Sequence, residues 1–267
     1  MICKATVWGQ SNFLQFDGGF IVMKFLVLVF SLFWFGLSDA SAKEVTVGMG
    51  NFEPYFIEEG DTGIFADLIT AVFRYMPDHH PKYIYDLPNR RLWRELEDGN
   101  IDALSNLFDS KEMDVCRSDQ IFRFHNVAVT KASAKIKISN ISDLAGNNIV
   151  TFQGAKHVFG NRFANLTNFQ SYTEVYADKL QVKMLIYDRA DVSVGDKFIF
   201  LHELKKIRKS LLEPIELVFH DIFPLYFARM GFYDKEICEL FNKGLKQVRQ
   251  TGEFESIYDT YLKSLIR

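Results

Sequence analysis

Short alternating runs and stretches with helical spacing follow one another along most of the chain. Residues 44–49 alternate polar and apolar side chains, which predicts a strand. Apolar residues then recur every three or four positions from Phe65 to Met76, which predicts an amphipathic helix. A β-prone run at 82–86, a helix from 89 to 98 and a strand at 101–104 continue the order. This alternation indicates an α/β fold with mostly parallel strands.

The pattern restarts after the middle of the chain. Predicted strands lie at 126–130, 148–153, 172–175, 190–194, 214–220 and 224–229, with helices at 155–164, from 178 and at 198–209. Two amphipathic helices, 237–248 and 254–265, end the chain. The segments 96–103 and 185–192 share one design, a helix end, a turn and a strand that opens on an acid. This internal similarity is consistent with two similar α/β halves. A chance likeness between two helix–turn–strand units is an equally good explanation.

The N-terminal region has the composition of a secretory signal. Lys24 precedes an apolar run at 25–37, and Ala40-Ser41-Ala42 provides a small-x-small cleavage site. The run is shorter than the ~20 residues that span a bilayer, so a single membrane anchor is the weaker alternative. We therefore predict a signal peptide at 23–42, cleavage after Ala42 and a periplasmic product. Residues 1–22 precede a signal with its own Met, and we interpret them as a mis-set start.

Composition narrows the classes of function. The net charge of −3 argues against a nucleic-acid partner, which requires a basic face. The 19 Phe that follow residue 42 and the 11 Tyr suffice for substantial cores and an aromatic-lined pocket. In an oxidising compartment Cys116 and Cys238 can pair, but spacing alone does not decide between a disulfide and two buried thiols. No metal or cofactor motif is found, so none is expected, and the basic run 204–209 is interpreted as a solvated helix face.

Several motifs occur in a characteristic order along the chain. They are the loop 52–56, the helix start 63–68, the turn and strand 99–103, the segment 141–146 before a strand ending at Gly154, the strand 190–196 and the helices 240–262. Their order and spacing resemble the extracytoplasmic solute-binding proteins of the polar amino-acid type (family 3). The resemblance implies two α/β lobes, joined by two hinge strands, with a ligand cleft between them. Lobe 1 would comprise 43–130 plus 222–267, and lobe 2 would comprise 131–221.

Strand ends in such a fold point into the cleft. Phe52, Tyr55 and Phe56 follow the first strand, and we expect an aromatic wall that stacks on the ligand, with loop packing as the alternative. Asp196 follows the strand 190–194. The resemblance implies that an acid here pairs with the ligand's amino group, whereas capping of the next helix is the alternative.

The anion-binding side of the predicted cleft departs from the family. Gly154 opens a helix whose free N–H groups suit an anion, but Ala155 and Lys156 replace the usual hydroxyl residues. Lys156 is expected to add charge there, and a solvated surface lysine is the alternative.

The arginine that clamps a carboxylate in the family would fall here on Met113 or Asp114, and neither can make that bidentate contact. Arg90, Arg91 or Arg117 are the possible replacements, although an arginine in the helical position of the first two is more often a solvated charge. Ser105 and Asn106, where the preceding strand ends, are further expected ligand contacts.

These features predict a monomeric binding protein that is not an enzyme. It would capture a small polar solute, an amino acid or a related compound, by hinge closure and deliver it to an ABC importer in the membrane. One alternative is a dehydratase-like enzyme on the same fold, with Glu53, Asp109 or Asp196 as its acid or base. Another is a periplasmic sensory protein whose partner is a membrane sensor.

Overall fold

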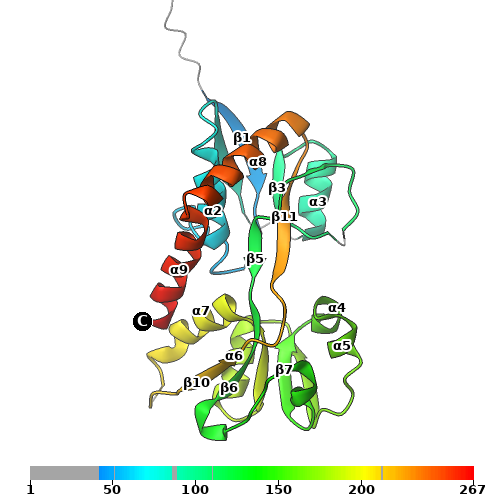
Figure 1. Cartoon of the computed structure of the whole chain (residues 1–267), viewed down its shortest axis with the longest axis vertical. Coiled ribbons are helices and arrows are strands. Elements are labelled where there is room, and N and C mark those ends of the chain that lie inside the picture. The colour runs from blue at the N-terminus through cyan, green and yellow to red at the C-terminus, as the bar shows by residue number, and fades with distance from the viewer. Residues whose placement is uncertain (1–41, 51, 86–88, 110, 212) are drawn as a thin grey trace, which may run out of the picture. The chain divides into compact units, whose positions relative to one another are not determined.

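The computed structural model describes residues 42–267, apart from residues 51, 86–88, 110 and 212 (Figure 1). The predicted upstream segment 1–22 and nearly all of the predicted signal peptide 23–42 lie outside the described residues. Within the described ranges, none of the helices combines the length and the apolar character that a membrane crossing requires.

The first sheet contains the N-terminal strands and one late strand. Its order is β2-β1-β3-β11-β4, and β5 pairs with β11 off this path. β1 lies parallel to β2 and β3, whereas β11 is antiparallel to β3, β4 and β5. The strands are β1 (Lys43–Gly48), β2 (His79–Ile84), β3 (Ala103–Leu107), β4 (Cys116–Arg117), β5 (Phe122–Phe124) and β11 (Tyr226–Phe232).

The second sheet has the order β10-β6-β9-β7-β8. β7 is parallel to β8 and β9, and β6 is antiparallel to β9 and β10. The strands are β6 (Asn126–Lys131), β7 (Asn148–Phe152), β8 (Ser171–Val175), β9 (Val192–Asp196) and β10 (Leu217–His220).

The chain passes between the sheets twice, and β5 and β11 run side by side along these passages (Figure 1). The first passage is at His125, because Asn126 is already paired with Asp196 of the second sheet. It therefore lies before strand 126–131, which the sequence analysis had assigned to lobe 1 as far as residue 130. The second passage lies between His220 and Tyr226.

Helices pack against both sheets. Those next to the first sheet are α2 (Ile64–Phe73), α3 (Asn89–Glu97), α8 (Lys235–Gln250) and α9 (Glu253–Ile266). Those next to the second are α6 (Asp178–Ile186) and α7 (Lys197–Arg208), and α7 also packs against α9. The short helices α4 (Ala155–Val158) and α5 (Gly160–Ala164) follow β7, and 3-10 turns lie at Ala132–Ala134 and Ile141–Leu144. The α7–α9 contact joins the two halves of the described chain.

The start of α2 is fixed by a glycine. Gly63 has a φ of 115°, and a Cβ there would lie 2.5 Å from the carbonyl oxygen of Tyr55. Only glycine accommodates both constraints without a shift of the backbone. From Gly63 on, the apolar residues of α2 are buried as their helical spacing predicted.

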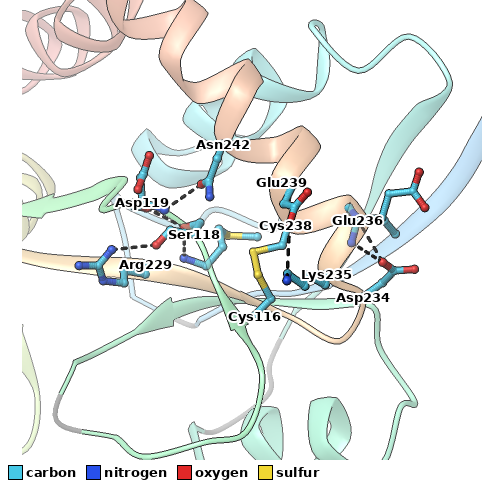
Figure 2. The surroundings of a disulfide bond; sticks show 12 residues. Cys116, Ser118, Asp119, Arg229, Asp234, Lys235, Glu236, Cys238, Glu239 and Asn242 are labelled. Carbon is cyan, nitrogen blue, oxygen red and sulfur yellow. Dashed lines mark hydrogen bonds and ion pairs between the residues drawn. A yellow bond between two sulfur atoms is a disulfide. The ribbon is translucent and has the colours of Figure 1, made fainter.

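Cys116 and Cys238 form a disulfide between β4 and α8, with Cα atoms 6.2 Å apart (Figure 2). The alternative of two buried thiols is therefore wrong. The carboxylate of Asp234 caps the first turn of α8 by accepting the backbone N–H groups of Glu236 and Ile237. The cap fixes the first turn of α8, and the disulfide holds this end of the helix against β4 of the first sheet.

Candidate functional site

A cavity of about 500 Å³ lies where the two sheets meet. Its volume is within the usual range for small-molecule sites. Most of its walls come from positions at or just beyond strand ends of both sheets, the place where open α/β sheets bind ligands. It is lined by Phe52, Asn106, Phe108, Phe124, Asn126, Phe152, His157, Val158, Asp178, Gln181, Asp196, Ile199, Phe200 and Tyr226.

Aromatic rings dominate the wall on the side of the first sheet. The ring of Phe108 lies 5.4 Å from that of Tyr226 and 5.9 Å from that of Phe124, between ring centroids. Phe52 continues this surface at 6.1 Å from Phe124. These tilted contacts pack the rings against one another into one continuous aromatic wall.

Asn106 reaches the cavity through an irregularity in β3. The β3–β11 register shifts between the pairs Leu107–Arg229 and Leu104–Gly231, so two residues of β3 face one residue of β11. Such a bulge turns a side chain away from its regular direction. Asn106 has a φ of 62°, a strained value for a residue other than glycine.

The amide of Asn106 is 5% exposed, and its carbonyl oxygen has no hydrogen-bond partner among the described residues. A buried acceptor without a partner costs about 1–3 kcal/mol. A donor on a bound molecule would remove that cost. Strain and an unpaired acceptor thus occur together at one residue of the cavity wall.

Asp196 ends β9, and its carboxylate is saturated with donors. One oxygen accepts the backbone N–H groups of Phe198 and Ile199, at 2.9 and 3.1 Å, which caps α7. The other accepts the hydroxyl of Tyr55 at 2.9 Å and the backbone N–H of His125 at 2.8 Å. Burial nevertheless raises the pKa of Asp196 to about 6. Asp196 therefore caps α7, which was the alternative considered for it. Its bond with Tyr55 also links the two halves of the fold.

Asp178 and Gln181 form the polar wall on α6. The amide nitrogen of Gln181 donates to the Asp178 carboxylate at 3.2 Å. Burial is the main reason why the pKa of Asp178 is raised, and the charge of Glu203 adds to it. No lysine or arginine of the described chain contributes to the cavity wall.

No protein-family model matches the chain, and no curated protein matches it. Solved structures do match. An ancestral arginine-binding protein bound to arginine is 18% identical over 83% of this chain and 99% of that chain, with a TM-score of 0.60. The GluR0 ligand-binding core in complex with L-glutamate is 15% identical over 83% and 99%, with a TM-score of 0.64. The second substrate-binding domain of a putative amino acid ABC transporter from Streptococcus pneumoniae is 17% identical over 82% and 100%, with a TM-score of 0.64.

The fold is that of the type 2 periplasmic-binding proteins. This confirms the predicted fold class of two α/β units joined by two strands. At these identities the likeness establishes the fold, and the function has to be argued from the cavity.

Within this type 2 fold, the predicted aromatic wall is only partly correct. Phe52 lines the cavity. Tyr55 and Phe56 are 0% and 2% exposed and lie outside the lining, packed against Phe65 of α2. Both residues therefore pack inside the protein, which was the alternative considered for them.

The predicted anion site at Gly154 is occupied from within the chain. The N–H of Gly154 donates to the carboxylate of Glu174 at 2.9 Å. The ammonium of Lys156 lies 4.6 Å from the ring centroid of Tyr172, and Lys156 is exposed. Neither Gly154 nor Lys156 lines the cavity, in contrast to the prediction that both contact the ligand.

No described arginine takes the place of the family's carboxylate clamp. Arg91 pairs with Glu95 at 3.2 Å on the surface of α3, and the side chain of Arg90 lies outside the described residues. Met113 does not line the cavity. Ser105 is 1% exposed and does not line it either, in contrast to its neighbour Asn106.

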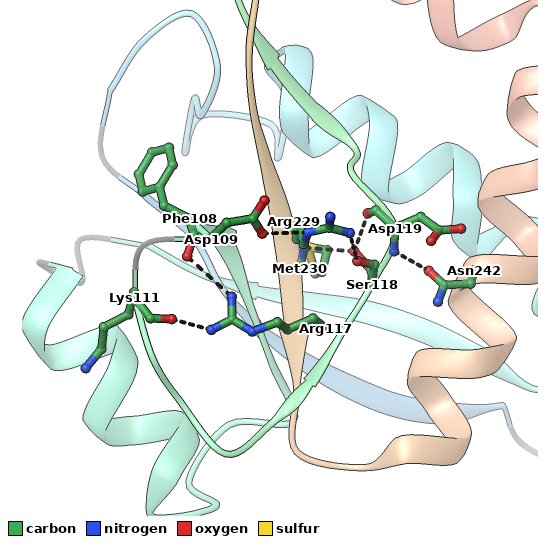
Figure 3. A network of polar contacts seen from close by, with 9 residues as sticks. All are labelled: Phe108, Asp109, Lys111, Arg117, Ser118, Asp119, Arg229, Met230 and Asn242. Atoms are coloured by element: carbon green, nitrogen blue, oxygen red, sulfur yellow. Dashed lines mark hydrogen bonds and ion pairs between the residues drawn. The ribbon is translucent and has the colours of Figure 1, made fainter. Parts of the chain in front are cut away.

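Two further arginines support the segment that carries Phe108 (Figure 3). Arg117 donates to the backbone carbonyls of Phe108, at 3.3 Å, and of Lys111. Arg229 donates to the carboxylate of Asp109 at 2.7 Å and to the carbonyl of Ser118 at 2.8 Å. Their guanidinium groups hold the backbone behind the aromatic wall and do not line the cavity.

Polar contacts outside the cavity also join the two halves of the fold. Glu53 accepts from His202 at 2.7 Å and from Lys206 at 2.8 Å, and Lys206 is the main reason why the pKa of Glu53 is lowered. Lys205 and Arg208 donate to backbone carbonyls at the end of α9, at 2.7 and 3.0 Å. The basic run 204–209 is thus not simply a solvated face, because three of its cations bind segments next to the first sheet.

The sequence analysis missed much of the lining. Phe152 ends a predicted strand and Asp178 opens the helix after one, so the strand-end rule, applied at every strand, would have found both. Phe124 and Tyr226 lie next to the two passages between the sheets. The sequence analysis placed the first passage too far along the chain, because it extended lobe 1 to residue 130. Gln181 and Phe200 lie one turn inside helices, where no local signal distinguishes them from core residues.

Proposed function

We propose that this chain is an extracytoplasmic solute-binding protein that captures a small molecule in the cavity between its two sheets. The observation that carries the proposal is the composition of the cavity wall. Strand ends of both sheets supply most of it, and it combines six aromatic rings with a few polar groups, including the unpaired carbonyl oxygen of Asn106. The amino acid-binding proteins with the same fold support this class of function.

In this proposal the lobes are residues 43–125 plus 222–267 and residues 126–221, and they move about the two passages between the sheets. Support comes from the two-stranded connection and from the hinge closure known for folds of this kind. The hydrogen bond from Tyr55 to Asp196 and the ion pairs of Glu53 then hold the closed arrangement.

We further propose that the protein works in the periplasm after cleavage behind Ala42. The signal-like composition of 23–42 supports export, and the Cys116–Cys238 disulfide fits an oxidising compartment. Expression of the full chain followed by N-terminal sequencing of the exported product tests this. Lys43 is the expected first residue, and a retained apolar segment would favour an anchor.

A ligand screen by thermal shift tests the proposed function. A solute present at about 100 times its Kd stabilises the folded state by about 2.7 kcal/mol. Tyr226→Ala, in the cavity wall, should weaken the response, whereas Tyr187→Ala, at a surface residue that is 58% exposed, should leave it unchanged. If no neutral, cationic or anionic small solute raises Tm, or if both variants respond alike, the proposal fails.

A sensory function is the second candidate, because a histidine kinase sensor domain has the same fold at 16% identity and a TM-score of 0.61. That comparison covers 83% of this chain. Both functions require the same binding step and differ in the partner of the bound form. Uptake of a radiolabelled ligand in cells with and without the gene separates them, since a transport role predicts lost uptake and a sensory role predicts lost gene regulation only.

A further inference from the structure

The charged groups of the cavity wall are acidic. Asp178 and Asp196 both line it, and the described lining contains no lysine or arginine. His157 is the one basic side chain of that lining, and it lies exposed on the short helix α4. A ligand carboxylate would therefore enter a site with two acids and no described guanidinium fork.

The two carboxylates differ in the number of hydrogen bonds that they accept from the protein. Asp196 already accepts four hydrogen bonds from the protein. Asp178 accepts one, from the neutral amide of Gln181, and forms no ion pair with a described residue. A half-buried carboxylate without a counter-ion gains most from a cation brought by the ligand.

A second observation, independent of the acids, also favours a donor on the ligand. The Asn106 amide lies on the opposite wall of the same cavity, 5% exposed, with its carbonyl oxygen unpaired among the described residues. This oxygen accepts hydrogen bonds and cannot donate them. Asp178 and Asn106 thus present acceptors from the two sides of the cavity.

The rest of the wall suits an apolar cation. Six aromatic side chains line the cavity, namely Phe52, Phe108, Phe124, Phe152, Phe200 and Tyr226. The faces of such rings carry partial negative charge and attract ammonium and guanidinium groups, while their area packs against an apolar body. The faces of these rings do not attract a carboxylate, and the hydroxyl of Tyr226 is the one hydrogen-bond donor among the six side chains.

We infer that the cavity takes an organic cation, an ammonium or guanidinium group on an apolar body, and that its ligand needs no carboxylate. This inference rests on the proposed function and names the class of solute. Asp178 pairs with the charged nitrogen, Asn106 accepts a second N–H, and the aromatic wall covers the body of the ligand.

Calorimetric titration with matched compounds tests the inference. The pairs are 2-phenylethylamine against L-phenylalanine and agmatine against L-arginine, which differ only by the carboxylate, and 3-phenylpropionate is the anion without an amine. We expect each amine to bind at least about tenfold more tightly than its amino acid, because the carboxylate meets two acids without a clamp. We expect no measurable binding of 3-phenylpropionate.

Asp178→Asn separates a binding role from a structural one. It should weaken amine binding by about tenfold or more, since the cation then meets a neutral amide oxygen in place of a carboxylate. The same variant should raise the Tm of the ligand-free protein, because it removes a half-buried charge that has no counter-ion among the described residues. Asp259→Asn, which removes an exposed acid on α9, is the matched control and should change neither quantity.

The outcomes that overturn the inference are distinct from those that overturn the proposed function. Tighter binding of the amino acids or of 3-phenylpropionate overturns the inference alone, and loss of that binding in Arg90→Gln would then assign Arg90 as the clamp. Unchanged amine affinity in Asp178→Asn also overturns it. So does a wider screen that finds only neutral or anionic ligands. A wider screen without any ligand, or an equal response of Tyr226→Ala and Tyr187→Ala, overturns the proposed function as well.

Discussion

The hydrogen bond between Tyr55 and Asp196 joins the two sheets inside the protein, and Tyr55→Phe removes it without removing the ring. The Tyr55 side chain is fully buried, and its hydroxyl lies 2.9 Å from the carboxylate. A hydrogen bond to a charged group contributes about 1.5–3 kcal/mol, and one between neutral groups about 0.5–1.5 kcal/mol. The cost of the variant should therefore depend on whether Asp196 is ionised.

The ionisation of Asp196 changes near neutral pH. Burial raises its pKa from 3.8 to about 6, so between these values the folded protein binds more protons than the unfolded chain. Stability due to this group is thus highest below about pH 4, falls as the pH rises through 6 and is constant above it. The difference amounts to about 3 kcal/mol, since one pKa unit corresponds to about 1.4 kcal/mol.

Tyr55→Phe should therefore lower the free energy of unfolding by about 2 kcal/mol at pH 7.5 and by about 1 kcal/mol at pH 5, measured by urea titration. The difference of about 1 kcal/mol corresponds to a further rise of somewhat less than one unit in the pKa of Asp196. The direction agrees with the bond from Tyr55, which lowers the pKa of Asp196 in the intact protein.

Tyr83→Phe is the matched control. The hydroxyl of Tyr83 is bonded to Thr70 at 2.7 Å and to the carbonyl of Ala66 at 3.2 Å, with no carboxylate among these partners. Its loss should cost about 1 kcal/mol at both pH values. Equal, pH-independent costs for the two variants would refute the reasoning, because Asp196 would then not be an ionised acceptor of the Tyr55 hydroxyl at neutral pH.

Three other features give predictions that unfolding experiments check. Replacing Cys116 and Cys238 together by alanine should lower the free energy of unfolding by about 2–5 kcal/mol, and reduction of the wild type should reproduce the loss; a cost near zero would contradict a native disulfide. Gly63→Ala should cost more than about 2 kcal/mol, because its methyl group would meet the carbonyl of Tyr55 at a strained φ; a tolerated alanine would contradict this helix start. Glu53→Gln should cost less than about 1 kcal/mol and lose its effect at high salt, since its ion pairs are exposed; a larger, salt-independent cost would show that they are shielded from solvent.

Regular periodicity made the fold predictable. The apolar spacing of α2, α8 and α9 and the alternation in β1 are properties of neighbouring residues, so they are visible in the sequence alone. The position of the first passage between the sheets was less predictable. The sequence pattern of strand 126–131 indicates a strand but does not indicate which sheet it joins. Pairing with β9 and β10, far away in sequence, decides that question.

The site was predictable where one strand end was sufficient to define it. Phe52 follows β1, Asn106 and Asp196 lie at the ends of β3 and β9, and all three line the cavity. Tyr55 and Phe56 also follow a strand, yet the turn before α2 directs them into the core, which the sequence pattern alone does not show. The free acceptor of Asn106 depends on the bulge in β3, and the solitary charge of Asp178 depends on what lies around it in space.

A crystal structure of the exported protein with the tightest-binding compound of the screen tests the central claim most directly. The account predicts a ligand enclosed between Phe52 and Asp178, with a nitrogen within hydrogen-bond distance of the Asn106 carbonyl oxygen. A ligand bound on the outer surface at saturating concentration, with the cavity between the sheets still empty, would contradict it.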